Sequence, residues 1–248
     1  MASINIRLQL NEKLYQKDPQ STELGKRILK NSVELIDDIG FEDFNFRKLA
    51  SRINSTEASI YRYFENKHLL LVYLLNWYWE WMKFRIDFNT MNIDNPIKKL
   101  KIAITMIVDT AKRNTSVEFI NEDMLHRIIV SEGIKGYHSK SVDKENEDGF
   151  FLSYKTLCLK IATIIQEINP EVPYPRALAS TLVETANNTI YFSRHLPRLT
   201  DIKYSSTQFY QNIIQMLEHI VFGAINQVDF KKINNTSKLT NGLGLHKN

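Results

Sequence analysis

Six prolines divide the chain into segments whose apolar residues recur every three or four positions. This spacing is typical of amphipathic α-helices, which tolerate proline only in their first turn or beyond their ends. The prolines are Pro19, Pro96, Pro170, Pro173, Pro175 and Pro197. Eight glycines and six prolines in 248 residues are about half the average share, which disfavours β-sandwiches and glycine-rich nucleotide-binding sheets. The sequence therefore predicts an all-α fold.

The periodic segments predict about nine helices, three packed into the first 64 residues and six longer ones afterwards. We expect them at residues 22–39, 46–53, 57–64, 67–88, 95–113, 117–131, 150–168, 174–195 and 205–228. Gly40 should end the first helix, Asn45 should cap the second, and Asn54 with Ser55 should turn the chain into the third. Residues 131–149 hold three of the eight glycines and a polar run, which predicts a solvated loop. The polar tail from Lys231 onward predicts disorder.

The net charge of +4 is unevenly distributed. Residues 45–68 carry +3, residues 69–225 balance to zero, and the tail 226–248 carries +3. A helix in the DNA major groove needs short polar side chains at its start, flanking cations for phosphates and an apolar underside. Residues 56–64 supply all three, with Ile60 and Phe64 four positions apart as the underside. A solvated surface helix with buried aromatics fits the same pattern, so charge and spacing leave both interpretations open.

Four motifs follow one another within residues 22–72. They are Ile28-Leu29, Gly40-Phe41, Phe46-Arg47-Lys48-Leu49-Ala50 and Ser59-Ile60-Tyr61-Arg62-Tyr63-Phe64-Glu65-Asn66-Lys67-His68-Leu69-Leu70. In this order they resemble the DNA-binding domain of TetR/AcrR-type transcriptional regulators. The resemblance implies an N-terminal arm over 1–21, a three-helix helix-turn-helix DNA-binding domain over 22–68, a helical ligand-binding and dimerisation domain over 69–228, and a disordered tail over 229–248. It also implies a homodimeric, ligand-responsive repressor that binds double-stranded operator DNA, with an unknown small-molecule effector.

Matching positions to the family assigns the DNA contacts. Arg47, Tyr61, Tyr63 and Lys67 would bind phosphates, and Arg62 would lie alongside the groove. Thr56 would open the recognition helix, with Glu57, Ala58 and Ser59 facing base edges. Glu57 would either help to cap its own helix or accept a hydrogen bond from a cytosine amino group. The sequence departs from the family pattern at two positions. Ser55 stands where the family usually has a small apolar residue, and Asn54 stands where it usually has glycine.

Two further sites are expected in the second domain. Aromatic residues crowd the helix at 67–88, which joins the two domains in the family, and they either line an effector pocket or pack in the core. The candidate pocket residues are Trp77, Trp81, Phe84, His126 and Phe192. The last two helices present apolar residues on more than one face, which indicates either a four-helix dimer interface, as in the family, or an internal helix. The candidate interface residues are Leu182, Ala186, Ile213, Leu217 and Ile220.

Other functional classes find little support in the sequence. The single cysteine, Cys158, excludes an intramolecular disulfide, and no Cys/His/carboxylate spacing suits a metal, so we expect neither metal nor cofactor. No nucleotide-binding or catalytic motif occurs, which disfavours an enzyme. Adjacent acids such as Asp37-Asp38 and Glu122-Asp123 are expected to be solvated. With neither a signal peptide nor a membrane-length apolar run, we expect a cytoplasmic chain without a membrane partner. An architectural or protein-binding member of the same fold, or a helical enzyme, remains the alternative.

Overall fold

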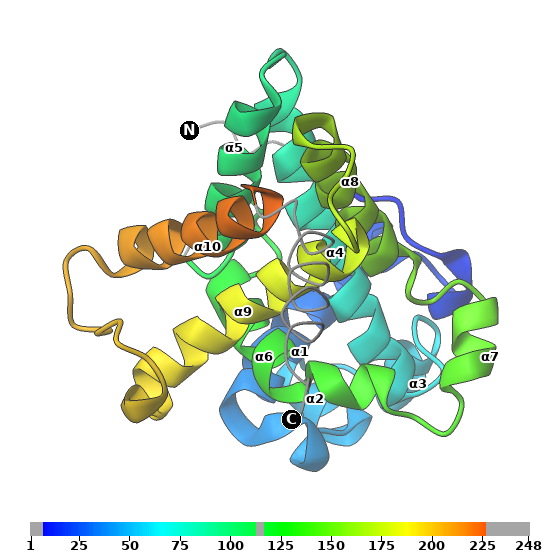
Figure 1. Ribbon diagram of the computed structural model, residues 1–248. Coiled ribbons are helices and arrows are strands. Elements are labelled where there is room, and N and C mark those ends of the chain that lie inside the picture. The colour runs from blue at the N-terminus through cyan, green and yellow to red at the C-terminus, as the bar shows by residue number, and fades with distance from the viewer. Residues whose placement is uncertain (1–6, 113–116, 227–248) are drawn as a thin grey trace, which may run out of the picture.

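The computed structural model describes residues 7–112 and 117–226 (Figure 1). This part of the chain contains ten α-helices, three short 3-10 turns and no strand, which confirms the predicted all-α class. The α-helices are α1 Glu23–Asp43, α2 Phe46–Arg52, α3 Glu57–Tyr61, α4 Lys67–Thr90, α5 Pro96–Asp109, α6 Glu122–Tyr137, α7 Val142–Glu147, α8 Leu152–Ile168, α9 Pro175–His195 and α10 Phe209–Asn226. The predicted disordered tail, 229–248, lies outside the described residues.

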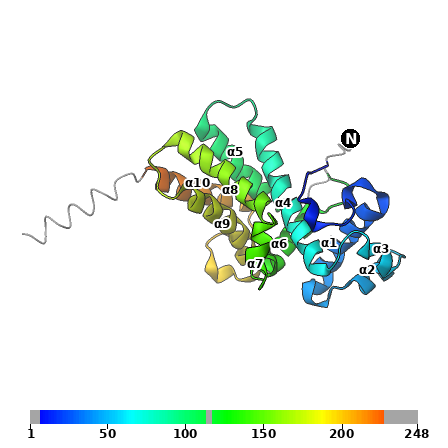
Figure 2. The ribbon, with the colours of Figure 1, turned by 90° about the vertical axis from the view of Figure 1, so that its right-hand side faces the viewer.

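The first three helices pack around a small apolar core. Thr22 caps α1 by accepting a hydrogen bond from the backbone N–H of Gly25. Gly40 interrupts α1 with a φ of 77°, where the sequence predicts an end, and one more turn follows to Asp43. Such a φ strongly favours glycine. Figure 2 shows these helices at one end of the molecule, with α5, α8 and α10 at the other.

The long helix α4 connects the two ends and is buried on nearly every side. All residues from Leu70 to Trp79 are buried, and α4 packs against α5, α6 and α8. A helix that is apolar all round must lie in the interior, because no face of it favours water. The aromatic crowding noted in the sequence is therefore largely core packing, and it fixes α4 between the two ends of the molecule.

The segment predicted as a solvated loop, residues 131–149, is mostly helical, and this prediction is wrong. Helix α6 continues to Tyr137, and α7 adds a short helix that raises the count to ten. Two glycines were interpreted as helix breakers, but they serve the packing of α6 against α4. A Cβ on Gly136 would stand 2.3 Å from Leu75 Cδ1, and one on Gly133 would stand 3.5 Å from Leu75 Cδ2. The two helices approach closely because glycine leaves room there.

The residues before α1 pack against both halves of the chain. Leu8, Leu10 and Leu14 are buried, and the side chain of Gln20 pairs with both backbone polar groups of Leu8. Farther along, the Lys13 ammonium lies 2.6 Å from a carboxylate oxygen of Asp148, just after α7. Residues 7–21 are therefore a packed strap rather than a loose arm.

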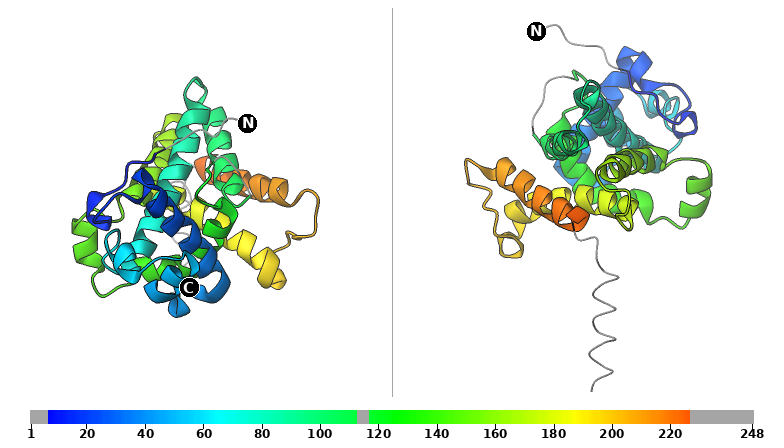
Figure 3. Two further views of the ribbon diagram at one scale, coloured as in Figure 1. Left: turned by 180° about the vertical axis from the view of Figure 1, so that it is seen from behind. Right: turned by 45° about the horizontal axis from the view of Figure 1, so that its top comes forward.

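Helices α9 and α10 project from one side of the second half, together with residues 196–208 between them (Figures 1 and 3). Their inner faces are buried against α5 and α8, which is where the apolar rows of both helices point. The opposite faces carry exposed residues, among them Tyr191 on α9 and Ile220 on α10.

Candidate nucleic-acid interface

Helices α2 and α3 form a helix-turn-helix with a tight turn. Asn54 adopts a left-handed φ of 49°, which asparagine tolerates better than most residues. The backbone N–H of Ser55 then donates to the carbonyl oxygen of Ala50 at 2.9 Å. Asn54 and Ser55, where the sequence departs from the family pattern, therefore still make a compact turn.

The start of α3 is capped by Thr56. Its hydroxyl oxygen accepts from the Ser59 backbone N–H at 3.2 Å and lies 2.9 Å from the Ser59 hydroxyl. Thr56 thus supplies the side-chain cap, and the expectation that Glu57 might do so finds no support in the contacts. Glu57 is exposed in the first turn, where a carboxylate interacts favourably with the helix dipole.

The underside of α3 is fully apolar. Ile60 and Phe64 have no exposed surface, as the four-residue spacing predicts. Tyr61 stands on the other side, 47% exposed, with its ring edge-on to Phe46 of α2 at 5.0 Å between centroids. This contact holds the Tyr61 ring while nearly half of the side chain stays exposed.

Most of the predicted DNA contacts are accessible. Arg47, Thr56, Glu57, Ala58, Tyr61 and Arg62 are exposed, and Ser59 is half-buried. These side chains combine short polar groups on the first turn of α3 with guanidinium groups on α2 and at the end of α3, which is the chemistry that a phosphate backbone and a major groove require.

Two predicted phosphate contacts have partners inside the protein instead. Tyr63 is 2% exposed, and its hydroxyl lies 2.8 Å from that of Thr22 at the start of α1. The Lys67 ammonium donates to the carbonyl oxygens of Phe41, Glu42 and Phe44, each at 3.0 Å. Both side chains therefore hold the domain together rather than presenting a free polar group.

A sequence profile described as "Bacterial regulatory proteins, tetR family" matches residues 28–74. The chain carries the DNA-binding domain of tetR-family regulators. The match begins within α1 and ends within α4, so it covers the whole helix-turn-helix and confirms the resemblance seen in the sequence. Among curated proteins, no sequence matches this chain significantly.

Solved structures share the fold at low sequence identity. AibR "in complex with isovaleryl coenzyme A and operator DNA" superposes with a TM-score of 0.56 at 15% identity, covering 79% of this chain and 97% of that one. The "fatty acid degradation regulator FadR from Bacillus halodurans" gives 0.54 at 18%, covering 77% and 93%. The "superantigen PfiT" gives 0.55 at 14%, covering 83% and 97%. The fold shared with these proteins thus extends well beyond the residues that the tetR-family profile matches.

Behind the tetR-family domain, the predicted pocket residues are only partly brought together. Trp77 and Trp81 are buried and stack at 5.8 Å, and Phe84, 37% exposed, stacks on Trp81 at 5.5 Å. His126 reaches this helix through Tyr78, whose hydroxyl lies 3.0 Å from His126 Nδ1. Phe192 is half-buried on α9, with its ring beside Tyr191.

Several buried polar groups near these aromatics lack hydrogen-bond partners among the described residues. They include Nε1 of Trp77 and of Trp81, and both carboxylate oxygens of Glu122. Glu122 is 1% exposed, and the nearest cation, Arg85, stands 3.8 Å away. Burial raises the pKa of Glu122 above its usual range. Unpaired buried polar atoms are costly, so they mark places where a ligand or water can bind.

The predicted dimer residues divide into two groups. Leu182, Ala186, Ile213 and Leu217 have no exposed surface within the single chain, whereas Ile220 is 37% exposed. The first four therefore pack α9 and α10 into their own domain.

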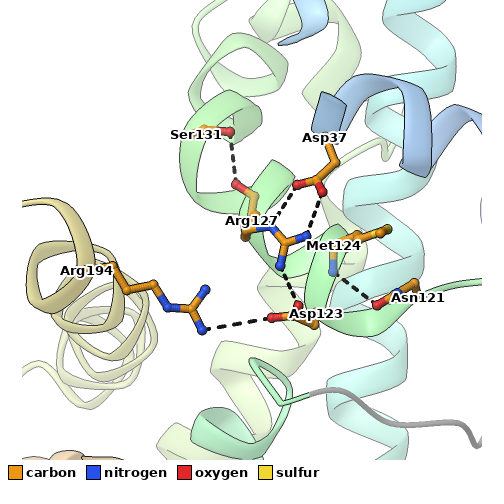
Figure 4. A network of polar contacts seen from close by, with 7 residues as sticks. All are labelled: Asp37, Asn121, Asp123, Met124, Arg127, Ser131 and Arg194. Atoms are coloured by element: carbon orange, nitrogen blue, oxygen red, sulfur yellow. Dashed lines mark hydrogen bonds and ion pairs between the residues drawn. The ribbon is translucent and has the colours of Figure 1, made fainter. Parts of the chain in front are cut away.

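One ion-pair network was missed in the sequence, where Asp37 and Asp123 were expected to be solvated. Arg127 on α6 binds Asp37 on α1 through two hydrogen bonds, of 2.8 and 2.6 Å, and also pairs with Asp123 (Figure 4). The hydrogen bond to Asp37 is the largest cause of the raised pKa of Arg127. A pair of residues 90 positions apart leaves no local sequence signal.

No helix within residues 7–112 and 117–226 is long and apolar enough to cross a membrane. Within the same ranges, no three His, Cys, Asp or Glu side chains are grouped so that they could bind a metal ion.

Proposed function

We propose that this chain is a homodimeric, sequence-specific repressor whose affinity for operator DNA is lowered by a small molecule in its second domain. The observation that carries the proposal is the exposed first turn of α3 on a helix-turn-helix that matches the tetR-family profile. The structure of AibR with operator DNA shows that a protein of similar fold binds such DNA. This function needs no catalysis by the chain.

In the proposed complex the two recognition helices enter successive major grooves about 34 Å apart. Thr56 opens the recognition helix, Ala58 and Ser59 face base edges, and Glu57 accepts from a cytosine amino group, since Thr56 already caps the helix. Arg47, Tyr61 and Arg62 contact the phosphate backbone. Tyr63 and Lys67 keep the domain in shape through Thr22 and the α1 carbonyls, so we propose an indirect role for them.

Replacing Arg47 by alanine tests the DNA contact. We expect weaker binding to all sequences and a salt dependence whose slope falls by about one, because one phosphate contact is lost. Affinity measured across a salt series checks this, with Lys203→Ala as the control, since Lys203 is exposed in the second domain. An Arg47→Ala slope equal to that of the wild type would remove Arg47 from the interface.

The effector site proposed for the second domain centres on Trp77, Trp81 and His126, with Phe84 and Phe192 toward its edges. The buried Nε1 of Trp77, which has no partner among the described residues, supports it, because a ligand could satisfy this donor. AibR, whose fold is similar, is described with isovaleryl coenzyme A. Effector binding would favour a conformation with wrongly spaced recognition helices, so occupancy lowers DNA affinity.

The proposed dimer uses the outward faces of α9 and α10. Ile220 is the exposed apolar anchor, and Gly223 leaves open surface beside it, since a Cβ there would meet no atom within 4 Å. Leu182, Ala186, Ile213 and Leu217 support the two helices from the inside.

Replacing Ile220 by aspartate is expected to weaken dimerisation by at least about tenfold, because a charge would be buried against the partner. Sedimentation velocity over a concentration series measures this, with Leu159→Asp on the exposed side of α8 as the control. Wild-type protein that remains monomeric at micromolar concentration would contradict the proposed dimer.

An architectural or protein-binding role on the same fold is the competing proposal. The fold is shared with a protein described as a superantigen, so architecture alone does not specify gene regulation. Such a role predicts no preference for any DNA sequence, which the binding measurements test directly.

A further inference from the structure

A cleft of about 310 Å³ opens between α1, α6 and α9, where the two halves of the chain meet. Its polar lining comes from His126 and Arg127 on α6 and from Arg194 and His195 at the end of α9, with Asp37 of α1 at one side. Val130, Ile190 and Tyr191 supply apolar walls. The volume lies at the lower end of the range for small-molecule sites.

The two arginines of this cleft are bound very differently (Figure 4). Arg127 is held by Asp37 and Asp123 on three of its nitrogens. Arg194 reaches from α9 toward Asp123, but its nearest carboxylate oxygen is 4.0 Å away, and its Nε is buried without a partner in the described part of the chain. Its guanidinium also lies 4.8 Å from the centre of the Tyr204 ring. Arg194 is therefore a cation that can donate further hydrogen bonds.

A second unpaired group faces the same cleft. His126 is 2% exposed, and its Nε2 has no partner among the described residues, whereas Nδ1 lies 3.0 Å from the Tyr78 hydroxyl. The Thr110 hydroxyl donates to the carbonyl oxygen of Ile107 at 2.6 Å and lies 3.0 Å from the Tyr78 hydroxyl, so Tyr78 donates to Thr110 and accepts from Nδ1–H of the neutral ring. Nε2 is then the unprotonated nitrogen, and it becomes a donor in the other neutral tautomer. Burial first, and then the positive charges of Arg194 and Arg127, lower the pKa of His126 to about 3, so the ring is neutral at pH 7.

The geometry points to a binding site for a small organic carboxylate, whose head group accepts hydrogen bonds from Arg194 and, when the neutral His126 ring moves its proton from Nδ1 to Nε2, from His126. Its apolar body lies on Val130, Ile190 and Tyr191. Both unpaired groups can donate, and one is a cation, which suits an anion and repels an amine. The neighbouring Arg127, which Asp37 and Asp123 hold in place, adds positive charge. An apolar body suits the site because Val130, Ile190 and Tyr191 line the cleft beside these donors.

This site would connect ligand binding to the DNA-binding half of the chain. Asp37 belongs to α1, and Arg127 holds it from α6 directly beside the carboxylate position. An anion attracting Arg127 and Arg194 competes with Asp37 and Asp123 for the same guanidinium groups. The regulatory consequence rests on the proposed function, whereas the binding itself does not.

Hexanoate is the probe, added to ¹⁵N-histidine-labelled full-length protein at pH 7 without DNA. The chain has six histidines, and His126→Gln identifies the signal of His126. We expect a saturable change of that signal toward the tautomer protonated on Nε2, and no change with hexanamide, which has the same body but no charge. Both ligands are compared on the wild-type chain, and His126→Gln serves only to assign the signal.

Arg194→Gln is expected to weaken hexanoate binding by about tenfold or more, whereas Arg198→Gln, on the exposed turn after α9, should leave it unchanged. No saturable response to hexanoate, equal responses to acid and amide, or equal affinity for inorganic phosphate would each overturn the proposal. Because DNA is absent, failure of DNA recognition would not alter this result, and failure of hexanoate to bind would not affect DNA recognition.

Discussion

Replacing Lys67 by methionine is expected to lower the free energy of unfolding by about 2 to 3 kcal/mol. The ammonium of Lys67 donates to three carbonyl oxygens at the end of α1 and just beyond it, and it lies 4.9 Å from the centre of the Phe41 ring. The last carbonyls of a helix have no partner within the helix. Removing the ammonium that donates to them therefore lowers the free energy of unfolding. Methionine keeps most of the apolar stem and removes only the charge and its hydrogen bonds.

Urea unfolding of wild type and variant measures this effect, with Lys30→Met as the control, because Lys30 is exposed on α1. DNA affinity should then fall only as far as the domain loses its shape. A Lys67→Met protein of wild-type stability with strongly reduced DNA affinity would contradict this, and would restore Lys67 to the phosphate contacts that the family resemblance implies.

Lowering the pH from 7 to 5 is expected to cost about 2 kcal/mol of stability through His126 alone. The folded-state pKa of His126 is lowered to about 3, by burial first and then by Arg194 and Arg127, against an unfolded value of about 6.5. A lowered pKa means that the native state resists protonation. The stability from neutral His126 is therefore fully present above pH 6.5 and is lost as the pH falls toward 3.

The comparison of wild type with His126→Leu isolates this effect, because leucine has similar bulk and does not titrate. Nearby groups such as Glu122 and Arg194 remain in both proteins, so their contributions largely cancel in the difference. We expect the variant to lose less stability than the wild type between pH 7 and 5, by about 2 kcal/mol. His219→Leu, on the exposed face of α10, is the control. Parallel pH profiles for wild type and His126→Leu would contradict the buried, neutral histidine.

The helix-turn-helix could be predicted because its signals are local. Asn45 and Thr56 stand at the cap positions, and Ile60 and Phe64 repeat at helical spacing, so a short stretch of sequence specifies both the fold and the exposed face. The extent of α6 could not be predicted, because a glycine in the sequence can either break a helix or let it pack closely. Gly133 and Gly136 do the latter, against Leu75. That distinction depends on a partner helix about 60 residues earlier.

The roles of individual polar residues depended even more on tertiary contacts. A lysine ammonium or a tyrosine hydroxyl that can bind a phosphate can equally bind a group inside the protein. Lys67 binds backbone carbonyls, and Tyr63 binds the Thr22 hydroxyl. Likewise, Asp37 and Asp123 resemble solvated acids in the sequence and become partners of Arg127 only when α1 and α6 meet. Residue type indicated the chemistry, whereas the fold selected the partner.

Selection of bound sequences from random DNA tests the central claim most directly. We predict that the purified chain enriches an inverted repeat, with half-site centres about 10 base pairs or a multiple of this apart, and that it binds this sequence at least about 1,000-fold more tightly than random DNA at ~0.15 M salt. Equal binding to all sequences, or no enrichment after repeated rounds, would contradict a sequence-specific regulator.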